Sequence, residues 1–312
     1  MSYTKRILHV DLSTGKTEIE PLKEEMARKY IGGIGLGMRL FLDNSKAGVD
    51  PFSPENPIIF ATGPLSGTMA PSAGNGYAVV SKSPLTEGIA ESKSHGFFGA
   101  ELKRAGYDAV IFTGKSEKLV YAWIDDDSVQ LMDAQHLKGK SPHETEMAIR
   151  EDLGDFYTRV TAIGEAGEKL VRIGCAINDE FRAVGRTGMG AVMGSKNLKA
   201  VAVRGTNDVN VAKPEEFTEF IRMIHERMKG PVYVTVDIDS VDPAYAPGTG
   251  TPEVGGLSSY QLLQLVRGLH GLNLVGFDLV EVSPPFDHGD ITAILASNIA
   301  FEYLSLLALK NG

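Results

Sequence analysis

The chain has 312 residues, which allows about two domains of roughly 150 residues each. Hydrophobic residues (43%) and charged residues (23%) occur at ordinary globular levels, and a net charge of −9 argues against broad binding to nucleic-acid phosphates. The single cysteine, Cys175, excludes a disulfide framework and any iron–sulfur cluster or structural zinc held by cysteines of this chain alone.

The composition of the chain changes near residue 230. From Pro231 onward there are nine acidic and two basic side chains, and all ten methionines lie before that point. Such a shift favours two pieces of different origin. We therefore expect a first domain over residues 1–212, a connecting helix and seam over 213–230, and a second piece over 231–312.

The first piece is rich in short apolar or alternating segments, which are typical of strands. Residues 13–16 predict a hairpin turn, and Ser141, with Pro142 after it and Glu144 three residues on, predicts a helix start. Because strands dominate without regular alternation with helices, we expect an α+β fold. The expected strands are Arg6–Leu12, Thr17–Glu20, Pro57–Thr62, Tyr77–Ser81, Ala109–Thr113, Leu119–Ile124, Ser128–Met132, Arg159–Ile163 and Lys199–Val203, and the expected helices are Leu22–Tyr30, Gly35–Asp43, Ser141–Leu153 and Lys213–Met228.

The second piece has a different pattern. Val232–Ile238 is a nearly continuous apolar run that ends in acids, as expected for a parallel strand buried on both faces. Leu272–Val280 predicts another buried strand, and Tyr260–Leu269 and Ile291–Leu309 predict helices. The order strand, helix, strand, helix is typical of an α/β fragment.

The sequence gives no sign of membrane insertion. No apolar run reaches the length of about 18–20 residues that spans a bilayer. The N-terminus is a polar segment followed by an alternating strand, unlike a signal peptide. We expect a cytoplasmic protein without membrane or nucleic-acid partners.

Glycines gather in four places in the first piece, at residues 32–37, 63–76, 96–99 and 185–194. The first cluster contains G-x-G-x-G, but a helical segment rather than a strand precedes it, which argues against a dinucleotide fingerprint. The glycines could serve only turns and tight packing. Several clusters in one domain also favour a large anionic cofactor held by backbone N–H groups.

Longer motifs identify the first piece more specifically. Residues 53–56, 63–65, 82–86, 98–108, 182–186 and 190–200 resemble the tungsten-containing aldehyde ferredoxin oxidoreductase family. The resemblance covers about residues 1–215. It implies a two-sheet α+β base on which two pterin dithiolenes chelate one tungsten, with their phosphates held by magnesium, backbone and side chains.

The resemblance also assigns cofactor contacts residue by residue. Arg182 and Arg186 suit phosphate because the planar guanidinium binds it with two N–H groups, although each could be a solvated surface arginine. Lys93 and His95 depart from the aldehyde-oxidising members and are closer to the branch that reduces aromatic acyl-thioester rings. Lys93 could supply charge in place of magnesium. The expected cofactor-binding residues are Asn75, Gly76, Lys93, Ser94, His95, Gly96, Arg182, Ala183, Gly185 and Arg186.

One part of that enzyme family is missing. The family's later domains supply four cysteines for a [4Fe–4S] cluster, further pterin contacts and the substrate channel. Cys175 alone cannot ligate such a cluster. We therefore expect no iron–sulfur cluster in this chain and no route for electrons to ferredoxin.

In the second piece, Asp237 and Asp239 stand two residues apart at the end of an expected strand, where α/β sheets bind ligands. They could form a solvated acidic turn or a site for a hard metal ion. Residues 236–243, 246–252, 255–257 and 278–287 resemble the last third of the ureohydrolase family, which includes arginases and agmatinases. The resemblance implies that Asp237 and Asp239 ligate two manganese ions and that Glu281 binds the substrate guanidinium. The family's upstream histidine and its Asp-Ala-His-x-Asp motif do not occur in this sequence.

Three hypotheses follow. The chain is a cofactor-binding part of a tungsten–pterin oxidoreductase, inactive alone; or a manganese-dependent guanidino hydrolase that needs ligands from elsewhere; or a non-catalytic fusion or assembly artefact. Two strands cannot shield both faces and both edges of a sheet. We therefore also expect the second piece to dock on the first piece, or a homo-oligomer or partner subunit to cover the truncated sheet.

Overall fold

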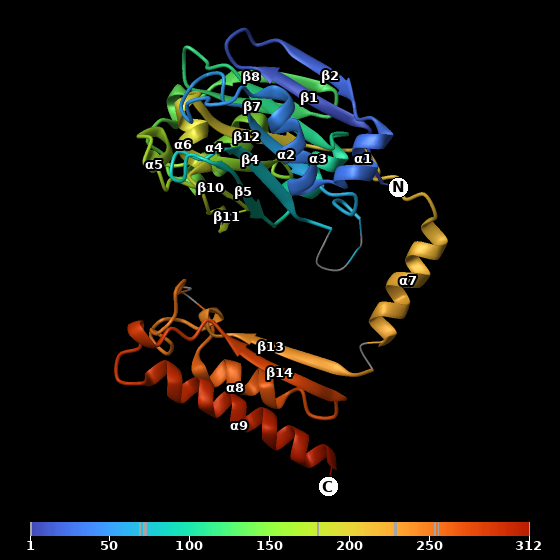
Figure 1. The fold of residues 1–312 in the computed structure, drawn as a ribbon, viewed down its shortest axis with the longest axis vertical. Coiled ribbons are helices and arrows are strands. Elements are labelled where there is room, and N and C mark those ends of the chain that lie inside the picture. Colours follow the sequence, from blue (N-terminus) through green and yellow to red (C-terminus); the bar gives the residue numbers. More distant parts are fainter. Residues whose placement is uncertain are drawn as a thin grey trace. The chain divides into compact units, whose positions relative to one another are not determined.

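The computed structural model describes residues 2–68, 70, 74–179, 181–227, 230–252, 254 and 256–311. The chain forms two compact units, Met1–Phe217 and Thr218–Gly312. Each unit has its own sheet structure (Figure 1). Each unit also has its own hydrophobic core. We describe the two units separately.

The first sheet of unit 1 has six strands in the order β2-β1-β6-β3-β4-β5. The β1–β6 pair is parallel and the other neighbours are antiparallel. Helices α1 and α2 cover one face, where Leu36 and Leu40 pack with Ile59 and Val80. The elements are β1 (Arg6–Asp11), β2 (Thr17–Pro21), α1 (Glu24–Tyr30), α2 (Gly33–Asn44), β3 (Ile58–Thr62), β4 (Tyr77–Lys82), β5 (Ile89–Ser94), α3 (Phe98–Arg104) and β6 (Ala109–Thr113).

The second sheet also has six strands, in the order β11-β10-β9-β12-β7-β8. Helix α4 packs on its outer face, where Ile149 contacts the cluster of Tyr121 and Val160. The elements are β7 (Val120–Asp125), β8 (Ser128–Asp133), α4 (Pro142–Leu153), β9 (Arg159–Ile163), α5 (Glu165–Glu168), β10 (Ala176–Asn178), β11 (Arg182–Val184), α6 (Met189–Ser195) and β12 (Leu198–Arg204), with a short 3-10 turn at Gln135–Leu137.

The two sheets share the largest core of unit 1. Phe60 and Tyr77 of the first sheet and Ile124 and Val201 of the second belong to one buried cluster. The expected α+β two-sheet domain is therefore confirmed. The expected helix cap is also present, because the Ser141 hydroxyl accepts from the Glu144 N–H at 3.2 Å and the Glu144 carboxylate accepts from the Ser141 N–H at 2.8 Å.

Unit 2 contains one pair of parallel strands with two helices packed on it. Figure 1 shows α8 and α9 together on one side of the β13–β14 pair. This arrangement confirms the α/β fragment expected from the sequence. Helix α7 (Pro214–Arg227) spans the boundary between the two units. The elements of unit 2 are β13 (Val232–Asp237), α8 (Ser259–Arg267), β14 (Leu274–Val280) and α9 (Ile291–Asn311), with 3-10 turns at Ile238–Ser240 and Pro284–Phe286. Met228, the last residue of one expected helix, lies outside the described residues.

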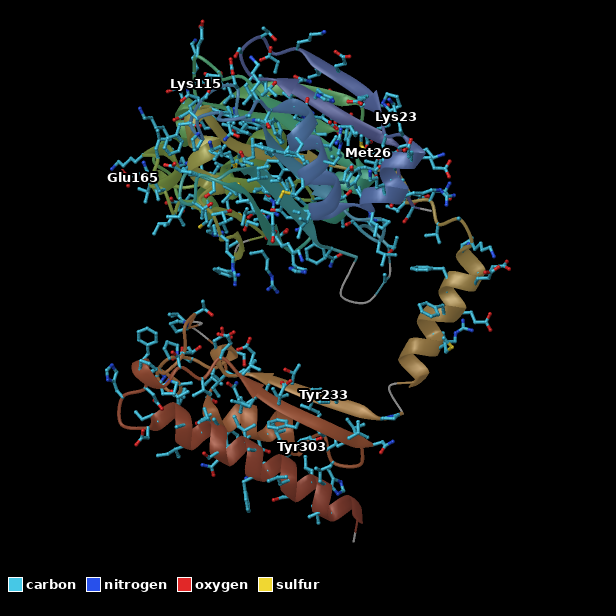
Figure 2. All side chains as sticks on the ribbon, viewed as in Figure 1. Lys23, Met26, Lys115, Glu165, Tyr233 and Tyr303 are labelled. Atoms are coloured by element: carbon cyan, nitrogen blue, oxygen red, sulfur yellow. The ribbon has the colours of Figure 1, made fainter. Side chains whose placement is uncertain are left out.

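The expectation that both strands of unit 2 are buried on both faces is wrong. Tyr233 on β13 is 60% exposed and Val275 on β14 is 59% exposed. Figure 2 labels Tyr233 on β13 and Tyr303 on α9. The Tyr303 hydroxyl donates to the Gly276 carbonyl at 2.7 Å. In β13, valines alternate with Tyr, Thr and Asp, so only the valine side packs on the helices.

The expectation that no apolar segment is long enough to span a bilayer also needs correction. Within the described residues, the segment Ile291–Leu309 of α9 is long and apolar enough to cross a membrane by length and composition, with a hydropathy of 1.6. A core helix of a soluble protein meets the same criterion. In α9, Leu295, Ile299 and Tyr303 are buried in the core of unit 2.

Candidate functional site

Strand β5 presents the first group of expected cofactor residues. It pairs antiparallel with β4, so that Lys93 lies opposite Ala78 and Ser94 lies opposite Tyr77. Side chains alternate along a strand. Ser94 is therefore buried between the sheets, while Lys93 is exposed, and His95, which directly follows the strand, is exposed as well.

The β10–β11 hairpin of the second sheet presents the other group. Asn178 pairs with Arg182 across this hairpin. Strand β11 lies against β5, and the N–H of Arg186 donates to the Ser92 hydroxyl at 3.1 Å. Two segments about 90 residues apart in sequence thus meet at one edge of the two-sheet core.

Two hollows adjoin at this edge. The first, of about 540 Å³, and the second, of about 340 Å³, share His95 as a lining residue. Ala183, Gly185 and Arg186 are exposed nearby and line neither hollow. The first hollow is lined by Thr68, Ala70, Gly74, Asn75, His95, Gly96, Phe97, Asp179 and Arg182, and the second includes Gly33, Gly76, Lys93, Ser94 and His95.

Glycine is required at two positions beside the hollows. Gly96 has a φ of +86°, and a Cβ there would lie 2.3 Å from Asp179 Oδ2. A Cβ on Gly99 would lie 2.9 Å from the carbonyl oxygens of both Asn75 and Gly76. Both distances are shorter than any real Cβ contact. Close backbone approach therefore explains part of the glycine pattern in the sequence.

The charges at this edge are predominantly positive. In the part of the chain that the structure describes, Lys93, Arg182 and Arg186 form no ion pair. The nearby Asp179 carboxylate is already engaged, because it accepts from the N–H groups of Phe97 and Phe98 and lies 3.4 Å from the Arg159 guanidinium. An anion that entered the hollows would meet unpaired cations.

Acidic residues of unit 2 also lie close together, but they are fewer than the residues that line the hollows of unit 1. The Asp239 N–H donates to Asp237 Oδ1 at 3.2 Å, and the Thr251 hydroxyl donates to the Asp239 carboxylate. Partial burial, together with the neighbouring carboxyls of Asp239 and Glu281, raises the pKa of Asp237 to about 6. Among the described residues there is no group of three or more His, Cys, Asp or Glu side chains that could hold a metal ion.

Comparison with known proteins finds two family matches, whose ranges overlap over residues 188–205. Residues 7–205 match the N-terminal domain of aldehyde ferredoxin oxidoreductase, and residues 188–305 match the arginase family. The tungsten-containing aldehyde ferredoxin oxidoreductase of Pyrococcus abyssi is 49% identical over 227 residues, which are 73% of this chain and 37% of that protein. The guanidinopropionase of Pseudomonas aeruginosa is 63% identical over 79 residues, which are 25% of each protein.

A solved structure supports the first match. The active-site complex BamBC of benzoyl coenzyme A reductase with 1,5-dienoyl-CoA aligns with a TM-score of 0.71 and 42% identity, over 73% of this chain and 35% of that chain. Both family resemblances are therefore confirmed, and the chain is a two-part chimera. It spans little more than a third of the length of the oxidoreductases and a quarter of the length of the guanidinopropionase.

Proposed function

The chain belongs to the aldehyde ferredoxin oxidoreductase family through residues 7–205, and on that premise we propose that unit 1 binds a tungsten bis-pterin cofactor through the cofactor's phosphates. The observation that carries this proposal is that Lys93 and Arg182, which line the two hollows, form no ion pair with any described residue. Phosphate groups are the dianionic part of such a cofactor. The donors present therefore fit the group.

Each residue of the site has a distinct task in this proposal. Arg182 and Arg186 bind phosphate oxygens through paired N–H groups, and Lys93 adds a point charge where relatives use magnesium. Gly76 and Gly96 line the hollows, and Gly96, which has no Cβ, allows the close approach of Asp179 and Asn178. When bound, the tungsten centre supplies the redox chemistry. We also propose that the protein is cytoplasmic.

We further propose that the chain does not oxidise aldehydes on its own. Its one cysteine, Cys175, is half-buried beside α6, and burial raises the pKa of its thiol. A single thiol cannot hold a four-iron cluster. Electrons from a bound tungsten centre therefore have no relay within these 312 residues.

The second unit does not fit the two-manganese centre of ureohydrolases. Asp237 and Asp239 are present, but no histidine or third metal-ligating carboxylate joins them among the described residues. Two carboxylates leave a divalent ion mostly hydrated and weakly bound. We therefore derive no hydrolysis step for unit 2, and we propose that a partner subunit or a second copy covers its exposed sheet face.

Metal and pterin analysis tests the cofactor proposal. The chain is expressed anaerobically with tungstate, and tungsten and pterin are measured in the purified protein. We expect both to copurify with the chain and to fall roughly tenfold in Arg182→Glu, as a loss of about 1.4 kcal/mol implies. The control is Lys115→Glu, an exposed charge reversal at another position of unit 1 (Figure 2). Wild-type protein without tungsten, or equal loss in the control, contradicts the proposal.

A further inference from the structure

A buried polar cluster lies between the two sheets, directly behind the hollows. Its central residue is Asn178, the last residue of β10, which is fully buried. Asn178 Oδ1 accepts from the Tyr77 hydroxyl at 2.9 Å and from the Ser94 hydroxyl at 2.7 Å. The Tyr77 hydroxyl also lies 3.0 Å from Thr161 Oγ1. The oxygen end of the amide thus joins β4 and β5 of the first sheet to the second sheet.

The nitrogen end of the same amide points to the site. Asn178 Nδ2 donates to the His95 carbonyl at 2.8 Å and to Asp179 Oδ2 at 2.7 Å. A side-chain amide has two donor hydrogens and two acceptor lone pairs, and all four are used here. A buried amide with every bond made is held in one orientation. The position of the His95 carbonyl is therefore fixed from the core.

Asp179 fixes the next part of the same segment. Its φ is +46°, a conformation that Asp and Asn adopt more readily than most residues. Its Oδ2 accepts from the Phe97 N–H at 2.7 Å and from the Phe98 N–H at 3.2 Å. Gly96 lies between these anchored positions, and a Cβ there would meet both Asp179 Oδ2 and Asn178 Nδ2 within 2.9 Å.

We propose that Asn178 and Asp179 form a positioning pair that holds the His95–Gly96 segment in place and so sets the spacing between His95 and Arg182 for an anionic ligand. Asn178 lines neither hollow, so it acts on the ligand only through this segment. The ligand class, a phosphate group, rests on the proposed function. The positioning itself depends only on the hydrogen bonds from Asn178 and Asp179 to residues 95–98.

Two substitutions separate the two ends of the amide. Asn178→Asp keeps an oxygen for Tyr77 and Ser94 but replaces the donor to the His95 carbonyl and places a second carboxyl beside Asp179. Tyr77→Phe removes a hydrogen bond from the oxygen end and leaves both bonds to the site intact. Both variants remove polar contacts from the same buried cluster, so each serves as the stability control for the other.

The full chain is studied by NMR, with inorganic phosphate as the probe. We expect Asn178→Asp to shift the signals of the His95 ring and the Gly96 amide and to weaken phosphate binding roughly tenfold. Tyr77→Phe is expected to lower stability while leaving the signals of the His95 ring and the Gly96 amide unchanged. Equal effects of the two variants, or unchanged His95 and Gly96 signals in Asn178→Asp, overturn the positioning role.

The remaining outcomes are also decisive. If wild-type protein binds no phosphate, the proposed cofactor site is refuted, and the His95 and Gly96 signals alone decide the positioning role. If Asn178→Asp does not fold, Gly96→Ala replaces it, because the added methyl displaces the segment from the pair without altering Asn178. Unchanged His95 ring signals in Gly96→Ala then overturn the proposal.

Discussion

A buried lysine predicts how the stability of unit 1 depends on pH. Lys196 follows α6 and is fully buried, and its ammonium group donates to the carbonyls of Pro54 at 3.0 Å and Gly114 at 3.1 Å. Burial lowers the pKa of Lys196 to about 8, from 10.5. Between these values the unfolded chain binds more protons than the folded chain, so the free energy of unfolding rises with pH. Integrated from pH 7 to pH 10, this contribution is about 2.5 kcal/mol.

Urea unfolding measures this contribution. Trp123 on β7 is the only tryptophan of the chain, so its fluorescence reports on unit 1 alone. The stability of wild type relative to Lys196→Met should increase by about 2.5 kcal/mol between pH 7 and pH 10, since methionine does not titrate. Lys115→Met removes an exposed charge and corrects for the change in net charge. A constant difference between wild type and Lys196→Met across this range would refute the reasoning.

Three further substitutions test local features. Ser141→Ala removes the helix cap and should destabilise unit 1 by about 1 kcal/mol, measured by Trp123 fluorescence in urea. Gly194→Ala places a Cβ 2.0 Å from the Gly167 carbonyl and should cost about 3 kcal/mol in the same assay. Asp237→Asn should stabilise unit 2 by about 1 kcal/mol at pH 7 and not at pH 4. The pKa of Asp237 is raised in the folded state, so ionisation of this carboxyl at pH 7 lowers the stability of the wild-type protein, and asparagine does not ionise. Hydrogen exchange of the β13 amides measures this last effect.

Elements with a local signal could be predicted from the sequence. The turn at 13–16 and the cap at Ser141 each contain the chemistry that forms them, and both occur where expected. Helix α6 was not predicted, because its seven residues include Gly190 and Gly194. These glycines allow contact with the backbone of Cys175 and Gly167, and that packing outweighs a weak helix propensity. Such a tertiary cause leaves no periodic pattern in the sequence.

The short strands beside the site escaped prediction for a related reason. β5 reads IAESKS, with serines at the buried positions, so its inward face does not look apolar. Those serines are buried because they bond to groups across the sheets: Ser94 to Asn178 and Ser92 to the Arg186 backbone. These hydrogen-bond partners can be identified only once the pairing of the strands is known. In β13, by contrast, the sequence itself shows that valines alternate with Tyr, Thr and Asp, and the polar positions indicate one exposed face.

The two halves of the chain show when a family motif predicts a functional site and when it does not. In unit 1 the expected cofactor residues His95 and Arg182 line one hollow because complete sheets bring β5 and β11 together. In unit 2 the motif residues Asp237 and Glu281 also approach each other, since the parallel pair of strands survives. The metal ligands that the family draws from other strands have no counterpart in this sequence. Partial burial, together with the neighbouring carboxyls of Asp239 and Glu281, raises the pKa of Asp237, and no third ligand joins these acids among the described residues. A matching motif predicts function only where the elements that complete its site are also present.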